Sequence, residues 1–181
     1  MENEKLHWVF GYGSLIWNPG FAFVRQMPAT LLGAHRRLSV LSHRHRGTAA
    51  RPGLVFGLVR GGSCRGMAFG VAPEAWEEAH DYLVAREMDN GVYLETVRPV
   101  QMADRSRGPA LTFMVDERHA QFAGKLDLKA QLEIVLGAVG ESGPNPDYVR
   151  ETAAHLSALG MADRYLDALV AEIDARAGPS P

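Results

Sequence analysis

The sequence lacks the features that would direct it to a membrane, a disulfide scaffold or a nucleic acid. Its 181 residues include one cysteine, Cys64, which excludes an internal disulfide and a cysteine metal cluster. No apolar run approaches the roughly 20 residues that a membrane helix needs, and residues 1–5 are not a secretion signal. A net charge of −2 lacks the basic excess of nucleic-acid-binding domains. We therefore expect a cytoplasmic protein without membrane or nucleic-acid partners.

Several common site motifs are also missing. Gly11 and Gly13 lack the third glycine of a dinucleotide-binding loop, and no Gly-Lys-Ser/Thr occurs. Ser14 does not lie in the Gly-x-Ser-x-Gly elbow of a hydrolase. His43 and His45 would share one face of a strand at a metal-like spacing, but no third or fourth ligand stands out. We expect no metal and no other cofactor.

The length and composition indicate one globular unit. The chain is 46% hydrophobic and 22% charged, and it is too short for two ordinary domains. We predict a single domain over residues 1–177. Residues 178–181, Gly-Pro-Ser-Pro, are expected to form a disordered tail.

Strands are predicted first and helices later. Stretches rich in Val, Leu, Phe and Tyr predict strands at residues 8–12, 29–41, 54–59, 67–72, 92–101 and 110–115. Capping and periodicity predict helices at residues 74–87 after Pro73, 128–139, 145–158 before Gly160, and 162–175. Short strands punctuated by glycine favour a small barrel or a strongly bent sheet. The predicted fold class is therefore α+β, with a helical C-terminal third.

Residues 9–17, Val-Phe-Gly-Tyr-Gly-Ser-Leu-Ile-Trp, form a turn that can hold an anion. Gly11 and Gly13 allow backbone angles closed to other residues, so consecutive N–H groups can converge on a carboxylate or phosphate. The hydroxyls of Tyr12 and Ser14 would add donors. A purely structural turn is the alternative, because two glycines after a strand occur in many tight turns.

An acidic residue continues the apolar face of the helix predicted at residues 74–87. That face is formed by Trp76, Ala79, Leu83 and Val84. Glu87 lies about three turns after Trp76 on the same face, so its carboxyl is aimed inward. Burial and the helix dipole both raise its pKa, which suits a general base or acid near neutral pH. A salt bridge with Arg86 or another arginine is the alternative.

Two more residues are candidates for binding. Arg46 belongs to a group of five arginines between Arg36 and Arg51, which would suit an anionic ligand or form a solvated basic face. Tyr148 follows the loop at residues 141–147 and begins a predicted helix. It would contribute to a site or simply pack.

Together these segments resemble the ChaC family of γ-glutamylcyclotransferases that act on glutathione. The matching segments, in order, are residues 9–19, 45–48 with 51–55, 86–94, and 142–148 with 159–161. The likeness extends from about residue 8 to residue 170. It implies a compact β-barrel flanked by helices, with the site where the turn at residues 12–15 meets Glu87.

The resemblance also implies a reaction. The α-amine of a γ-glutamyl group attacks its own γ-carbonyl and releases 5-oxoproline, and glutathione yields cysteinylglycine as the second product. No cofactor takes part. The implied roles are general base and acid for Glu87, and substrate binding for Tyr12, Gly13, Ser14, Leu15, Arg46 and Tyr148. The alternatives are a cyclotransferase acting on other γ-glutamyl peptides or amines, and a non-catalytic binder of γ-glutamyl metabolites.

Overall fold

The computed structural model describes residues 5–177; residues 1–4 and the predicted tail at 178–181 lie outside the described residues. The chain divides into two compact units. The barrel unit comprises Met1–Arg37 and Gly57–His119, and the helical unit comprises Leu38–Phe56 and Ala120–Pro181. The single domain expected over residues 1–177 stays a prediction. Within residues 5–177, no helix is long and apolar enough to span a membrane.

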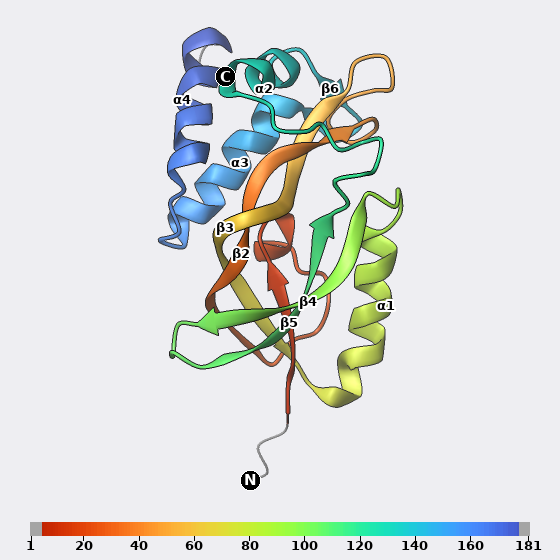
Figure 1. Ribbon diagram of the computed structural model, residues 1–181, viewed down its shortest axis with the longest axis vertical. Helices are drawn as coiled ribbons and strands as arrows, with labels where there is room; N and C mark the ends of the chain where they lie inside the picture. Colours follow the sequence, from red (N-terminus) through yellow and green to blue (C-terminus); the bar gives the residue numbers. More distant parts are fainter. Residues whose placement is uncertain (1–4, 178–181) are drawn as a thin grey trace. The chain divides into compact units, whose positions relative to one another are not determined.

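A closed barrel with strand order β1-β3-β2-β4-β5 forms the centre of the barrel unit (Figure 1). Its strands are β1 (His7–Gly11), β2 (Arg25–Ser42), β3 (Gly53–Val71), β4 (Tyr93–Met102) and β5 (Arg107–Val115). Strand β1 pairs antiparallel with β3 and parallel with β5, so the sheet is mixed. The predicted α+β class, with a small mixed barrel and a helical C-terminal third, is confirmed.

Strand β3 corrects one prediction. The strands expected at residues 54–59 and 67–72 are two parts of this single strand. Gly61 and Gly62, between them, have φ angles of 94° and 72°, in the left-handed region that favours glycine. The glycines therefore bend the strand without ending it.

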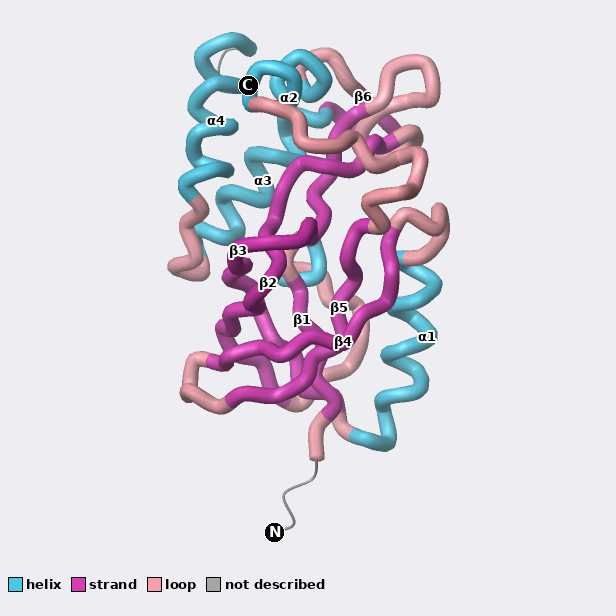
Figure 2. Tube along the Cα trace, in the orientation of Figure 1, coloured by secondary structure: helices cyan, strands magenta, loops and turns pink. Residues whose placement is uncertain are grey.

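Apolar side chains fill the barrel, and one helix accompanies it. The core consists of Phe10, Tyr12, Ala29, Leu31, Ala34, Leu58, Cys64, Ala68, Val100, Met102, Ala110 and Met114. Helix α1 (Trp76–Glu87) follows the short 3-10 helix η2 (Pro73–Ala75) and lies along β4 (Figure 2). His80 Nε2 of α1 is 3.0 Å from Glu95 Oε1 of β4. Ala79 and Leu83 of the predicted inward face are buried, whereas Trp76 and Val84 are half-buried.

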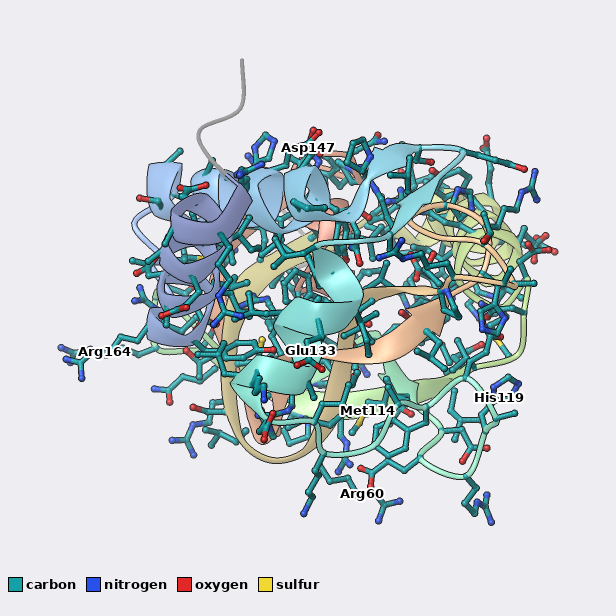
Figure 3. The ribbon with its side chains drawn as sticks, turned by 90° about the horizontal axis from the view of Figure 1, so that it is seen from above. Arg60, Met114, His119, Glu133, Asp147 and Arg164 are labelled. Carbon is teal, nitrogen blue, oxygen red and sulfur yellow. The ribbon has the colours of Figure 1, made fainter. Side chains whose placement is uncertain are left out.

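Three α-helices belong to the helical unit. They are α2 (Leu128–Val135), α3 (Asn145–Ala158) and α4 (Arg164–Ala177). Helices α3 and α4 lie side by side (Figures 1 and 2) and enclose Leu156, Leu166 and Leu169. Gly160, with φ of 67°, ends α3 as predicted. The charged side chains of Glu133, Asp147 and Arg164 lie away from this core (Figure 3).

Helix α2 is shorter than the predicted helix at residues 128–139. It ends at Val135, and Gly137 then lies so close to the Arg51 guanidinium that a Cβ atom there would overlap it. The chain continues as β6 (Val139–Gly140), which pairs with β7 (Gly143–Pro144). The helix predicted at residues 128–139 is therefore correct only as far as Val135.

Candidate functional site

Close packing at Gly11 and unusual backbone angles at Gly13 shape the turn after β1. Gly11 ends β1, and the 3-10 helix η1 (Ser14–Ile16) follows. A Cβ atom on Gly11 would lie 3.0 Å from Leu15 Cβ, so a larger residue would push the turn open. Gly13 has φ of −132°, and nothing lies within 4 Å of the position of a Cβ atom. With ψ of −129° as well, Gly13 has backbone angles outside the regions open to other residues, as the sequence predicts, and it leaves open space beside the turn.

Tyr12 is the part of the turn that faces the barrel interior. The residue is 7% exposed and belongs to the apolar core, whereas the sequence suggested a hydroxyl beside a ligand. Its carbonyl oxygen accepts a hydrogen bond of 2.5 Å from Arg36 Nε, and Arg36 Nη2 also donates to the Arg65 carbonyl. In a trans peptide the C=O and the next N–H point in opposite directions. Arg36 therefore fixes the direction of the Gly13 N–H.

Ser14 is tied to helix α1. Its Oγ accepts a hydrogen bond of 2.8 Å from Arg86 Nη2. The η1 helix donates its first internal hydrogen bond from the Ile16 N–H to the Gly13 carbonyl. The N–H groups of Ser14 and Leu15 precede that bond, so the helix itself does not use them. The turn thus presents two amide donors beside a hydroxyl that is already fixed in place.

Glu87 is the last residue of α1, and its side chain is only 18% exposed. Burial raises the pKa of Glu87, and the neighbouring guanidinium of Arg86 partly opposes this effect. The predicted direction of the pKa shift is confirmed. Arg86 Nε lies 3.3 Å from Glu87 Oε1, so the ion pair foreseen as the alternative is present as well. A buried carboxylate of raised pKa and the Ser14 turn therefore share one arginine.

The helical unit brings together the other two predicted residues. The Arg46 guanidinium carbon lies 5.3 Å from the centre of the Tyr148 ring, and Arg46 Nη1 donates to the Pro144 carbonyl. Arg46 Nη2 is 3.6 Å from Glu151 Oε2. The hydroxyl of Tyr148 accepts a hydrogen bond of 3.1 Å from the Phe56 N–H. These contacts give Arg46 and Tyr148 a defined arrangement, which the sequence did not predict.

Asn145, the first residue of the helix predicted at residues 145–158, has a role that the sequence did not predict. It is fully buried, and its side-chain amide pairs with both backbone groups of Leu54 in β3. The two hydrogen bonds are 2.7 and 2.8 Å long. An Asn before Pro indicates the start of a helix. The neighbouring residues do not indicate that its side chain pairs with a strand 91 residues away. The amide fixes the start of α3 and hence the position of Tyr148.

The two histidines of the segment at residues 43–47 do not lie on a strand as expected. The segment is a loop between β2 and β3, and His45 Nδ1 lies 3.1 Å from Ser142 Oγ. Over residues 5–177, no three His, Cys, Asp or Glu side chains are grouped so that they could hold a metal ion.

Comparison with known proteins places the chain in a family. The model of the ChaC-like protein family matches residues 7–176. The chain belongs to the ChaC-like family. The matched residues extend over both units and include the turn, Glu87, Arg46 and Tyr148.

Curated ChaC-like relatives cover most of the chain. The glutathione-specific gamma-glutamylcyclotransferase of Escherichia coli is 33% identical over 166 residues, which are 92% of this chain and 72% of the relative. The protein of the same name from Schizosaccharomyces pombe is 30% identical over 195 residues, covering 97% and 95% of the two chains.

A solved structure supports the fold of this ChaC-like chain. The crystal structure of a gamma-glutamyl cyclotransferase specific to glutathione from yeast superposes with a TM-score of 0.84. The superposition covers 93% of this chain and 96% of the yeast chain at 21% identity. At this identity the likeness establishes the fold.

Proposed function

We propose that this protein is a γ-glutamylcyclotransferase that degrades glutathione to 5-oxoproline and cysteinylglycine. The observation that carries the proposal is the buried Glu87 carboxyl, linked through Arg86 to the Ser14 turn. The names of the E. coli and S. pombe relatives support the same activity. The barrel unit thus contains both groups that the reaction needs. Glu87 is the proton acceptor, and the Ser14 turn is the anchor for charged oxygen atoms.

Glu87 serves as general base and then as general acid. The α-amine of a peptide has a pKa of about 8, so it is protonated at neutral pH and must lose a proton before it attacks. Glu87 accepts that proton. The amine nitrogen then forms a bond to the γ-carbonyl carbon, and the bond from this carbon to the cysteinyl nitrogen breaks. Glu87 returns the first proton to the leaving nitrogen as this bond breaks. The ring nitrogen then gives up its second proton, which ends on the released amine of cysteinylglycine, so no water and no cofactor are consumed.

The turn at residues 12–15 anchors the γ-glutamyl group. Its N–H groups and the Ser14 hydroxyl are suited to the substrate α-carboxylate or to the oxyanion that develops on the γ-carbonyl. Gly13 supports this role because the space beside it is open. Anchoring brings the amine to about 3 Å from the carbonyl carbon, the distance at which orientation accelerates cyclisation. Tyr12 and Leu15 are buried and hold this turn in shape.

The remaining assignments complete the proposal. Arg46 pairs with an anionic end of the substrate, and Tyr148 supports Arg46 through its ring. The two units act as one domain over residues 1–177. The protein works in the cytoplasm, where its single buried thiol, Cys64, stays reduced.

The test is incubation of the purified protein with glutathione. We expect 5-oxoproline and cysteinylglycine in equal amounts, measured by chromatography. Formation of neither product contradicts the proposal. A parallel panel of other γ-glutamyl peptides and amines separates the substrate classes, because a preference for one of these over glutathione would replace the assignment. Tight binding of glutathione without product would instead indicate a non-catalytic binder.

A further inference from the structure

Arg86 contacts several groups of the candidate site besides the carboxylate with which it forms an ion pair. Its guanidinium group donates to Ser14 Oγ through Nη2 at 2.8 Å and to the Asn18 carbonyl through Nη1 at 2.6 Å. Nη1 also lies 3.3 Å from the Pro19 carbonyl oxygen. Nε faces Glu87 Oε1 at 3.3 Å. All three nitrogens of the planar guanidinium are therefore in use, on groups that belong to both halves of the site.

The bond to Ser14 determines what its hydroxyl can do. A serine hydroxyl has one donor and two acceptor positions. Because Arg86 has no acceptor, Ser14 Oγ must accept in this bond. The hydroxyl proton is left to point elsewhere, so the hydroxyl can donate to an oxygen atom of a bound substrate. Arg86 thus selects the donor orientation of Ser14.

The contact with Glu87 fixes the carboxylate in two respects. Arg86 and Glu87 are adjacent on the helix, and adjacent side chains point in different directions. Their contact through Glu87 Oε1 therefore holds the carboxylate in one orientation, with Oε2 as the oxygen that accepts a proton. Arg86 also opposes the effect of burial on the pKa of Glu87, and it is the charged side chain that shifts this pKa among the described residues. Without Arg86, the base would be protonated up to a higher pH.

A second contact on α1 holds the guanidinium itself. Tyr82 lies one helical turn before Arg86, and its hydroxyl oxygen is 3.1 Å from Arg86 Nη1. The Tyr82 hydroxyl also lies against Gly20, where a Cβ atom would overlap it. Gly20 has φ of 75°, which favours glycine as well. The segment from Ser14 to Gly20 is therefore fastened along the end of α1.

We propose that Arg86 is a positioning residue that couples the substrate-anchoring turn to the general base. It holds Ser14 as a donor and Glu87 as an oriented carboxylate, and it need not contact the substrate. The inference rests on the proposed function, because it assigns Arg86 a part in that reaction.

The experiment separates the charge of Arg86 from its shape. Arg86→Met removes both, whereas Arg86→Lys keeps the charge but loses the planar fork. We expect both to lower kcat for glutathione by about 10²-fold, a loss typical of misplaced reacting groups. In Arg86→Met, the acid limb of the kcat/KM profile should move to higher pH, and in Arg86→Lys it should stay near that of the wild type. Arg25→Gln, which breaks the exposed pair with Asp104 in the same unit, is the matched control and should retain wild-type kinetics.

A titration without substrate tests the coupling independently of turnover. The carboxyl carbon of Glu87, followed by ¹³C NMR, should titrate at a higher pH in Arg86→Met than in the wild type. Wild-type protein that forms no 5-oxoproline would contradict the proposed function, yet this titration would still test Arg86. Wild-type kcat/KM in both variants, together with an unchanged Glu87 titration, overturns the positioning role. If Arg86→Met does not fold, a lowered kcat with an unmoved acid limb in Arg86→Lys supports the role, and a wild-type kcat overturns it.

Discussion

Arg86 in the barrel unit and Arg46 in the helical unit have similar contacts but different partners. Each donates to a backbone carbonyl, lies close to a tyrosine and faces one carboxylate. The carboxylate facing Arg86 is Glu87, whose side chain is 18% exposed, whereas that facing Arg46 is Glu151, which is 57% exposed. Burial raises the pKa of Glu87, while water solvates Glu151. The arginine beside the buried carboxylate therefore belongs to a pair in which the carboxyl can exchange a proton near neutral pH. The arginine beside the exposed carboxylate mainly fixes the loop that contains Arg46.

The barrel unit should therefore carry the chemical step, and the helical unit should affect binding and stability. This division makes the two units separable by single substitutions. A helical-unit variant that abolished kcat while the protein stayed folded would break the comparison.

The largest effect is expected from Glu87→Gln. The amide keeps the shape of the side chain but cannot accept a proton, so kcat for glutathione should fall by about 10²-fold or more. The measurement is the initial rate of 5-oxoproline formation. Glu78→Gln, an exposed position on the same helix, is the control and should leave the rate unchanged. Full activity of Glu87→Gln would contradict the role of Glu87 as general base.

Asn145→Ala should have the largest effect in the helical unit, on stability. The substitution leaves the buried N–H and C=O groups of Leu54 without their partner, which we expect to cost about 2–4 kcal/mol in the free energy of unfolding. Urea unfolding measures this loss. Ser157→Ala, at an exposed position of α3, should change it little. A loss below about 0.5 kcal/mol would show that α3 does not depend on this amide.

Arg46→Met tests whether the helical unit contributes to binding. If Arg46 pairs with an anionic end of glutathione, its loss should raise KM about tenfold with little change in kcat, which corresponds to about 1.4 kcal/mol. Steady-state kinetics separate the two constants. Arg44→Gln, whose pair with Glu141 is exposed, provides a control in the same loop. An unchanged KM in Arg46→Met would leave this arginine a purely structural role.

Local patterns predicted those parts of the site that depend on neighbours in sequence. The inward position of Glu87 follows from the periodicity of α1, and the turn follows from Gly11 and the strand before it. The contact between Tyr82 and Arg86 is also predictable from the sequence, because residues four apart on a helix face each other.

The parts that were missed depend on groups far apart in the chain. The sequence places Arg36 in an arginine group that suits an anionic ligand or a solvated face, yet it is buried against the carbonyl of Tyr12. Asn145 reaches Leu54, and Gly137, which follows α2, lies against the Arg51 guanidinium. Periodicity reports which face of an element is apolar, but it does not identify the distant partner of a polar group. Such partners become visible only in the folded chain.

The smallest expected effect concerns the stability of the barrel unit as a function of pH. Because burial raises the pKa of Glu87 in the folded state, the folded protein binds this proton more tightly than the unfolded chain does. The stabilisation from the protonated carboxyl is complete below the pKa of the unfolded chain and is lost as the pH rises through the folded-state pKa. Glu87→Gln is neutral throughout, so its free energy of unfolding relative to the wild type should increase from acid to neutral pH.

Urea unfolding of both proteins at a series of pH values measures this difference, and Glu78→Gln again serves as the control. A difference that stays constant with pH would mean that Glu87 is ionised without cost in the folded protein. In that case its ion pair with Arg86 would fully compensate its burial, and the contrast with Glu151 would no longer separate the two units.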